Sequence, residues 1–201
     1  MDFVLPRRPV ALSLISGKGH YESIIEPLAN AQRSVWISTA NLKELLVADP
    51  RLRPGRSRTR ARRNYRSVLG VMDELAERGV ELRILHAREP SQPFRDALDR
   101  HPRLWRGGLA LRMCPRVHLK VVIIDGTRLY LGSANWTGAG LGAKGENRRN
   151  FELGVLTEDE RWLDAVQDLY EQIWRGRPCK SCRLRKECEA PLDLCKDDSR
   201  S

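Results

Sequence analysis

The stretch HLKVVIIDGTRLYLGSAN, residues 118–135, predicts a buried strand, a turn and a second strand. Its residues 121–124 are four consecutive branched apolar residues, a pattern typical of a strand that is covered on both faces. An Asp-Gly pair then supplies the turn, after which apolar and polar residues alternate again. Because side chains alternate along a strand, His118 and Lys120 are expected to project from the same face at one end of this core strand.

The second strand ends in a cluster of small polar residues, Gly-Ser-Ala-Asn. A hairpin of this length brings Ser133 and Asn135 back beside the end that carries His118 and Lys120. The hairpin therefore predicts a polar site at the edge of an apolar sheet.

On both sides of this hairpin, helical and extended patterns alternate along the chain. The apolar spacing predicts helices at 22–31, 68–79, 92–101 and 160–174, and strands at 33–40, 80–86, 109–113 and 151–157. This order indicates an α/β protein in which a mixed β-sheet is flanked by helices on both faces. We expect one catalytic domain at 1–174, with an Arg-rich insertion at 50–66, followed by a small Cys-rich tail at 175–201.

The positive charge of the chain is concentrated in one segment. The 201 residues carry a net charge of +10, and residues 51–66 contain eight Arg and no acid. A solvated insertion is one interpretation. The other is a binding site for a polyanion, since guanidinium matches phosphate with two parallel hydrogen bonds and binding releases counterions. The candidate nucleic-acid ligands are Arg51, Arg53, Arg56, Arg58, Arg60, Arg62, Arg63 and Arg66.

Apolar runs are short throughout the sequence. A stretch of about eighteen apolar residues, the length that spans a membrane, is absent, and the N-terminal residues do not match a secretory signal. We expect a cytoplasmic protein without a transmembrane segment.

The spacing of six residues in the hairpin resembles the HKD signature of the phospholipase D (PLD) superfamily, H-x-K-x4-D-x6-G-S-x-N. All six positions match, and the likeness extends over about residues 18–174. It implies the PLD-like α-β-α sandwich and a phosphodiesterase activity. Glu152 stands where many members of the superfamily have an acid after the motif.

The residue types of the motif suit phosphodiester hydrolysis, which needs a nucleophile, an acid and positive charge near the phosphate oxygens. His118 is the candidate nucleophile and would form a phosphohistidine intermediate. Lys120 would supply charge, Asn135 an amide donor and Ser133 a hydroxyl.

Two carboxylates complete the candidate catalytic set. Glu152 could accept a hydrogen bond from the second ring nitrogen of His118. Asp125 lies an odd number of residues from His118, so a regular strand sends it to the opposite face. It is therefore either catalytic or a turn residue before Gly126.

The sequence holds one copy of the motif, whereas the chemistry of the superfamily uses two histidines. The resemblance implies a homodimer in which two copies share one active site. We expect a metal-independent endonuclease that acts on nucleic acid, with DNA favoured over RNA. A phospholipase D or cardiolipin-type lipid hydrolase is the alternative, and a non-catalytic nucleic-acid-binding subunit is a third possibility.

The tail carries four cysteines within 17 residues. Four thiolates can bind zinc or an iron–sulfur cluster, and the sequence leaves these two open. The C-x2-C-x5-C part resembles the cluster-binding tails of some DNA repair glycosylases and nucleases, in which the fourth Cys lies upstream. Here the nearest candidate follows, so the predicted ligands are Cys179, Cys182, Cys188 and Cys195. Cys114 is expected to be a small core residue. No cofactor is expected for catalysis.

Overall fold

The structure is a computed structural model that describes residues 2–48 and 65–195. At the centre of the molecule lies a mixed β-sheet. Its seven strands follow the order β1-β9-β8-β7-β2-β5-β6. The strands β2, β5 and β6 run parallel, and the other neighbours pair antiparallel. The bounds are β1 Ser13–Ser16, β2 Ser34–Thr39, β5 Glu81–His86, β6 Ala110–Met113, β7 Val121–Ile124, β8 Arg128–Gly132 and β9 Leu153–Thr157.

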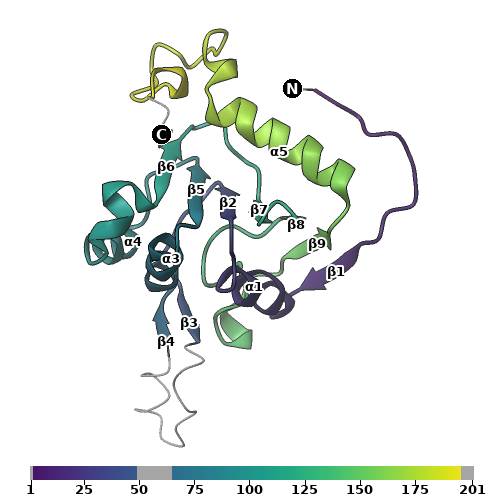
Figure 1. Cartoon of the computed structure of the whole chain (residues 1–201), viewed down its shortest axis with the longest axis vertical. Helices are drawn as coiled ribbons and strands as arrows, with labels where there is room; N and C mark the ends of the chain where they lie inside the picture. Colours follow the sequence, from purple (N-terminus) through teal and green to yellow (C-terminus); the bar gives the residue numbers. More distant parts are fainter. Residues whose placement is uncertain (1, 49–64, 196–201) are drawn as a thin grey trace, which may run out of the picture.

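Helices cover both faces of this sheet (Figure 1). The main helices are α1 Glu26–Leu28, which continues a π-helical turn at Tyr21–Ile25, then α3 Val68–Glu77, α4 Gln92–Asp99 and α5 Glu160–Trp174. Shorter helical turns lie at Leu104–Gly108, Glu146–Arg148, Arg177–Cys179 and Leu192–Leu194.

Alternate residues of each central strand decide which helices lie on which face. Val122 and Ile124 of β7 pack in the large core with residues of α1, α3 and α4. Val121 and Ile123 pack instead in a separate cluster with Leu163 of α5. Each residue of β7 is buried, as the unbroken apolar run predicts. The predicted α/β fold with helices on both faces is confirmed.

The sequence did not predict three of the strands. β1 is an edge strand whose residues are mostly exposed, so it lacks an apolar period and is held by its backbone pairing with β9. The other two, β3 (Leu46–Ala48) and β4 (Tyr65–Ser67), form a separate antiparallel pair that extends away from the main sheet (Figure 1). Each is three residues long, too short to give a periodic signal.

The last helix, α5, ends at Trp174, where the composition changes to the Cys-rich tail. The tail packs against the domain rather than standing apart from it. Leu192 is buried in one cluster with Tyr170 and Trp174, and Cys179 packs against the same cluster.

Candidate active site

Four chain segments meet at one edge of the sheet. Here β2 ends at Thr39, β7 begins at Val121, β8 ends at Gly132 and β9 begins at Leu153. The β7–β8 hairpin is in register at this edge, and the Gly132 N–H donates to the carbonyl oxygen of Lys120 at 3.2 Å. The structure therefore brings His118 and Lys120 beside the Gly-Ser-Ala-Asn segment, as the sequence predicts.

His118 and Lys120 lie just before β7 rather than inside it. The Nζ atom of Lys120 lies 3.1 Å from each ring nitrogen of His118 and donates to the His118 carbonyl oxygen at 2.9 Å. Lys120 is only 9% exposed, whereas His118 is exposed. Burial lowers the pKa of Lys120, and the negative charge of Glu152 opposes this shift. An accessible imidazole is thus held against a largely buried ammonium group.

Asn135 is oriented by the end of β2. Its Oδ1 atom accepts hydrogen bonds from the backbone N–H groups of Ala40 and Asn41, both at 3.1 Å, and from the Thr39 hydroxyl at 3.3 Å. These donors assign the side-chain oxygen, so the amide Nδ2 points the other way. Among the described residues no partner of Nδ2 is found, which leaves this N–H group available to a substrate.

Ser133 and Glu152 form a pair on the exposed side of the site. The Ser133 hydroxyl donates to Oε2 of Glu152, and Asn150 Nδ2 donates to Oε1 of the same carboxylate at 3.1 Å. The predicted contact between Glu152 and His118 is not among the hydrogen bonds of the described chain. Glu152 acts on the site through its charge on Lys120 and its bond to Ser133.

Gly132 of the motif is explained by a neighbouring ring. A Cβ atom at Gly132 would lie 2.2 Å from the Tyr130 hydroxyl, and one at Gly154 would lie 2.3 Å from the same ring. The phenol is buried, which raises the pKa of Tyr130 to about 12. The sequence did not single out Tyr130, which packs edge-on against the buried ring of His20. Gly132 on β8 and Gly154 on β9 therefore leave room for the Tyr130 ring.

Asp125 lies at the opposite end of β7 from the other predicted catalytic residues. Its carboxylate accepts hydrogen bonds from the backbone N–H groups of Gln32, Arg33 and Ser34, which open β2. Burial raises the pKa of Asp125, but these bonds outweigh that effect and the net shift is downward. The residue also has a positive φ of 56°, a conformation that Asp tolerates better than most residues. The structure thus supports the turn-forming alternative and does not bring Asp125 to the site.

A comparison with known protein families supports the family resemblance that the motif indicates. The family described as "Cardiolipin synthase, PLD-like domain" matches residues 24–174, a span that includes all six motif positions. This chain belongs to the PLD-like family.

Among curated relatives of this PLD-like chain is the mitochondrial cardiolipin hydrolase of Chlamydomonas reinhardtii, 28% identical over 110 residues. The match covers 53% of this chain and 45% of that protein, so the chain spans less than half the length of the relative.

Two solved structures share the PLD-like fold. NucT from Helicobacter pylori has a TM-score of 0.55 at 17% identity, and Nuc from Salmonella typhimurium, a phospholipase D family member, has a TM-score of 0.55 at 15% identity. Each match covers 82% of this chain and 95% of the other.

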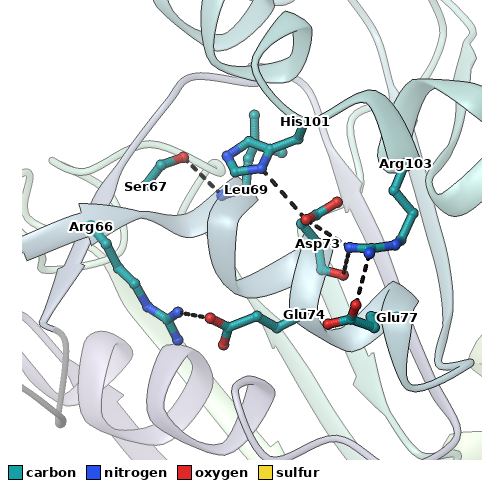
Figure 2. A network of polar contacts seen from close by, with 8 residues as sticks. All are labelled: Arg66, Ser67, Leu69, Asp73, Glu74, Glu77, His101 and Arg103. Atoms are coloured by element: carbon teal, nitrogen blue, oxygen red, sulfur yellow. Dashed lines mark hydrogen bonds and ion pairs between the residues drawn. The ribbon is translucent and has the colours of Figure 1, made fainter.

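Most of the predicted nucleic-acid ligands of the PLD-like chain, Arg51 to Arg63, lie outside the described residues. Arg66 lies in β4, and its guanidinium group donates to the carboxylate of Glu74 on α3 (Figure 2). A second set of contacts on the same helix joins Asp73 to His101 and Arg103, and Glu77 to Arg103 (Figure 2). The structure therefore places Arg66 in an ion pair that anchors β4 to α3.

The structure brings three of the four predicted metal ligands of the tail to one pocket and leaves the fourth, Cys195, outside it. Cys195 is exposed, and its thiol contacts the carbonyl oxygen of Pro191 at 3.9 Å. Cys179, Cys182 and Cys188 are partly buried and line a pocket together with Cys114. Within residues 2–48 and 65–195, no three His, Cys, Asp or Glu side chains are close enough to hold a metal ion in their present conformations.

Proposed function

We propose that this chain hydrolyses phosphodiester bonds of nucleic acid through a phosphohistidine intermediate, without a catalytic metal ion. The observation that carries the proposal is the cluster of an exposed His118, a buried Lys120 and an oriented Asn135 at one sheet edge. These groups provide a nucleophile, a positive charge and an N–H donor, which suit attack on a phosphodiester.

The reaction takes two displacements. A ring nitrogen of His118 attacks phosphorus, the bond from phosphorus to the leaving oxygen breaks, and a second histidine donates a proton to that oxygen. Water then attacks the phosphohistidine, the N–P bond breaks, and the second histidine takes the proton of the water. Lys120 and the Nδ2 group of Asn135 stabilise the charge that develops on the non-bridging oxygens in both steps.

The second histidine is supplied by a second copy of the chain in this proposal. His20 and His86 are buried, and His101 lies beside Asp73 of α3. A twofold axis beside His118 would bring two copies of the motif together. Exposed apolar side chains flank the site and would be covered by such a dimer: Leu14 is 69% exposed, Leu153 55%, and Phe151 is fully exposed.

Sedimentation at assay concentration tests the dimer. Leu14→Asp should increase the monomer fraction and make specific activity fall on dilution. Leu46→Asp is the control, because Leu46 is also exposed (55%) but lies on β3, away from the site. A fully active species of 23.0 kDa would contradict the shared site.

Nucleic acid is favoured as the substrate because eight Arg lie within residues 51–66, a density that suits a polyanion. The similarity to a cardiolipin hydrolase favours a second candidate, hydrolysis of a lipid phosphodiester. No helix among the described residues is long and apolar enough to cross a membrane. A cytoplasmic location belongs to the same proposal.

The substrate is tested by incubating purified protein in EDTA with labelled single-stranded DNA, double-stranded DNA, RNA and a panel of phospholipids. Cleavage of nucleic acid, with DNA before RNA, is expected. Turnover of a lipid alone would favour the second candidate, and tight DNA binding without any turnover would identify a binding subunit. Metal content is measured after the assay, so that loss of a structural metal is not mistaken for loss of a catalytic one.

The Arg segment is tested by the salt dependence of binding. Replacing Arg56, Arg58, Arg60 and Arg62 with Gln should weaken DNA binding and lower the slope of log K against log salt by about one unit for each phosphate that is no longer bound. An Arg66→Gln variant serves as a control, because its guanidinium is already paired with Glu74. An unchanged slope in the fourfold variant would mean that the segment does not contact phosphate.

A further inference from the structure

Cys114 shares a pocket with three cysteines that lie more than sixty residues later in the chain. The pocket lies between the segment that follows β6 and the tail, and Cys179, Cys182 and Cys188 line it together with Cys114. All four thiols are partly buried, whereas Cys195 is exposed and does not line the pocket. The fold therefore selects a different set of four cysteines from the one that spacing in the tail suggests.

Tight backbone turns hold these cysteines. The N–H of Cys114 donates to the His86 carbonyl at 2.8 Å, and the Cys114 carbonyl accepts from Val117 at 2.9 Å. In the tail the Cys182 N–H donates to the Cys179 carbonyl at 3.2 Å. Cys114 and Cys179 both pack against one buried apolar cluster, which fixes the segment after β6 relative to the tail.

Two basic side chains, Arg116 and Arg185, line the pocket, and Arg183 lies close enough to act on the charge of Cys182. Arg185 also forms an ion pair with Asp193. Four thiolates around a divalent ion, or around a cluster core of charge +2, carry a net charge of −2. The guanidinium groups would offset this charge, which makes the pocket a favourable place for a thiolate centre.

We propose that Cys114, Cys179, Cys182 and Cys188 bind one metal centre, either tetrahedral zinc or an iron–sulfur cluster, and that Cys195 is not a ligand. Each thiol loses its proton on binding, so up to four protons are released. The thiols converge by rotation about χ1, the single side-chain torsion of cysteine that moves the sulfur. This proposal does not depend on the activity proposed above.

Such a centre would tie the tail to the catalytic strand. Cys114 lies four residues before His118, and residues 115–117 are the only link between them. Loss of metal would release this segment from the tail and with it the backbone that positions His118. The tail is therefore expected to affect activity through the position of His118 rather than through contact with substrate.

Metal content of single Ser variants tests the ligand set. The chain is purified without oxygen, and zinc, iron, sulfide and the visible absorption spectrum are measured. We expect about one zinc ion, or one cluster that contains iron and sulfide and absorbs visible light, in wild type and in Cys195→Ser. Cys114→Ser should lose the metal as fully as Cys179→Ser does. Zinc without sulfide would identify a zinc site, and iron with sulfide would identify an iron–sulfur cluster.

A measurement on the wild-type chain covers the case in which Cys114→Ser fails to fold. Native protein is alkylated with iodoacetamide before and after removal of metal, and the modified cysteines are identified by mass spectrometry. Cys114 should be protected only in the metal-loaded protein, and Cys195 should react in both. Metal loss in Cys195→Ser with retention in Cys114→Ser, equal alkylation of Cys114 in both states, or a wild type that binds neither zinc nor iron would each overturn the proposal.

Discussion

The two ends of β7 carry polar residues of the same motif but use them differently. At the Asp125 end, the carboxylate is saturated by backbone N–H groups of its own chain. At the His118 end, the imidazole is exposed and the Nδ2 group of Asn135 has no partner among the described residues. The first end is satisfied internally, and the second leaves its hydrogen-bonding groups for a ligand.

The surroundings of the two ends differ in charge as well. A groove beside Asp125 is lined by Glu22, Glu26 and Glu158, and its one basic residue, Arg128, is paired with Glu158, so the groove is unfavourable for a phosphodiester. The His118 end holds a lysine against the imidazole. The six motif residues therefore fall into two sets, one with a proposed chemical role and one with a structural role. Substitutions in the first set should change activity, and substitutions in the second should change stability.

The largest effect is expected for the nucleophile. His118→Ala should lower hydrolysis by about 10⁴-fold or more, because the imidazole supplies both the attacking nitrogen and, from the other copy, the acid. Turnover is measured on the substrate identified in the panel, with thermal unfolding as the check on folding. His101→Ala is the matched histidine control and should keep its activity. Substantial turnover by His118→Ala would refute the mechanism.

The next effect is expected for the two groups that are proposed to contact phosphate. Lys120→Ala and Asn135→Ala should each slow the reaction by on the order of a hundredfold, the usual scale for removing one transition-state donor. Lys120→Met keeps most of the buried volume and shows how much of the loss belongs to the charge. A wild-type value of kcat in any of these variants would remove that residue from the site.

At the other end of β7 the expected effect is on stability. Asp125→Asn keeps a residue that tolerates positive φ but removes the charge that accepts the three N–H bonds, so it should lower the free energy of unfolding by about 1–3 kcal/mol at neutral pH. Activity per folded molecule should change little. A large loss of kcat without a loss of stability would place Asp125 in the catalytic machinery after all.

The pH dependence of unfolding sharpens this test. The pKa of Asp125 is lower in the folded chain than its usual value, so its contribution is complete above the unfolded-state pKa and is lost as pH falls through the folded-state pKa. Wild type should therefore lose stability in acid more steeply than Asp125→Asn. Denaturant unfolding between neutral and acidic pH measures both curves.

The smallest effect is expected for Glu152. Its charge raises the pKa of Lys120 against the effect of burial, so Glu152→Gln should lower that pKa. In a plot of kcat/KM against pH, the alkaline limb should then move to lower pH, because Lys120 loses its charge at a lower pH. Ser133→Ala removes the hydrogen bond to Glu152 but keeps the carboxylate, and it should shift the limb less. An unmoved limb in Glu152→Gln would mean that Lys120 does not set it.

Local patterns in the sequence predicted most of the fold and the centre of the site. The apolar run at 121–124 and the spacing of the motif placed His118, Lys120 and Asn135 together, because a hairpin fixes its own register. The role of Asn135 as an acceptor for Ala40 and Asn41 was not predictable, since those residues are about 95 positions away and nothing local marks the pairing.

The same limit applies to Cys114 and to Asp125. The sequence favoured Cys195 because it lies close in the chain, while the fold brings the distant Cys114 to the pocket. For Asp125 the period of two along a strand correctly raised a structural alternative, and the contacts with the start of β2 support it. Nearness along the chain predicts partners well within a hairpin and poorly between a sheet and its tail.

The β3–β4 pair has a consequence for how this protein could diversify. Ala48 and Tyr65 stand opposite each other in this ladder, so the two ends of the segment between them are fixed side by side on a stem outside the main sheet. Lengthening a closed segment costs only about 0.6 kcal/mol for each doubling. Evolution, or an engineer, could therefore exchange residues 49–64 for a segment of another length or charge and leave the strand ends beside His118 unaltered. Under the function proposed above, target choice and bond cleavage would then vary independently.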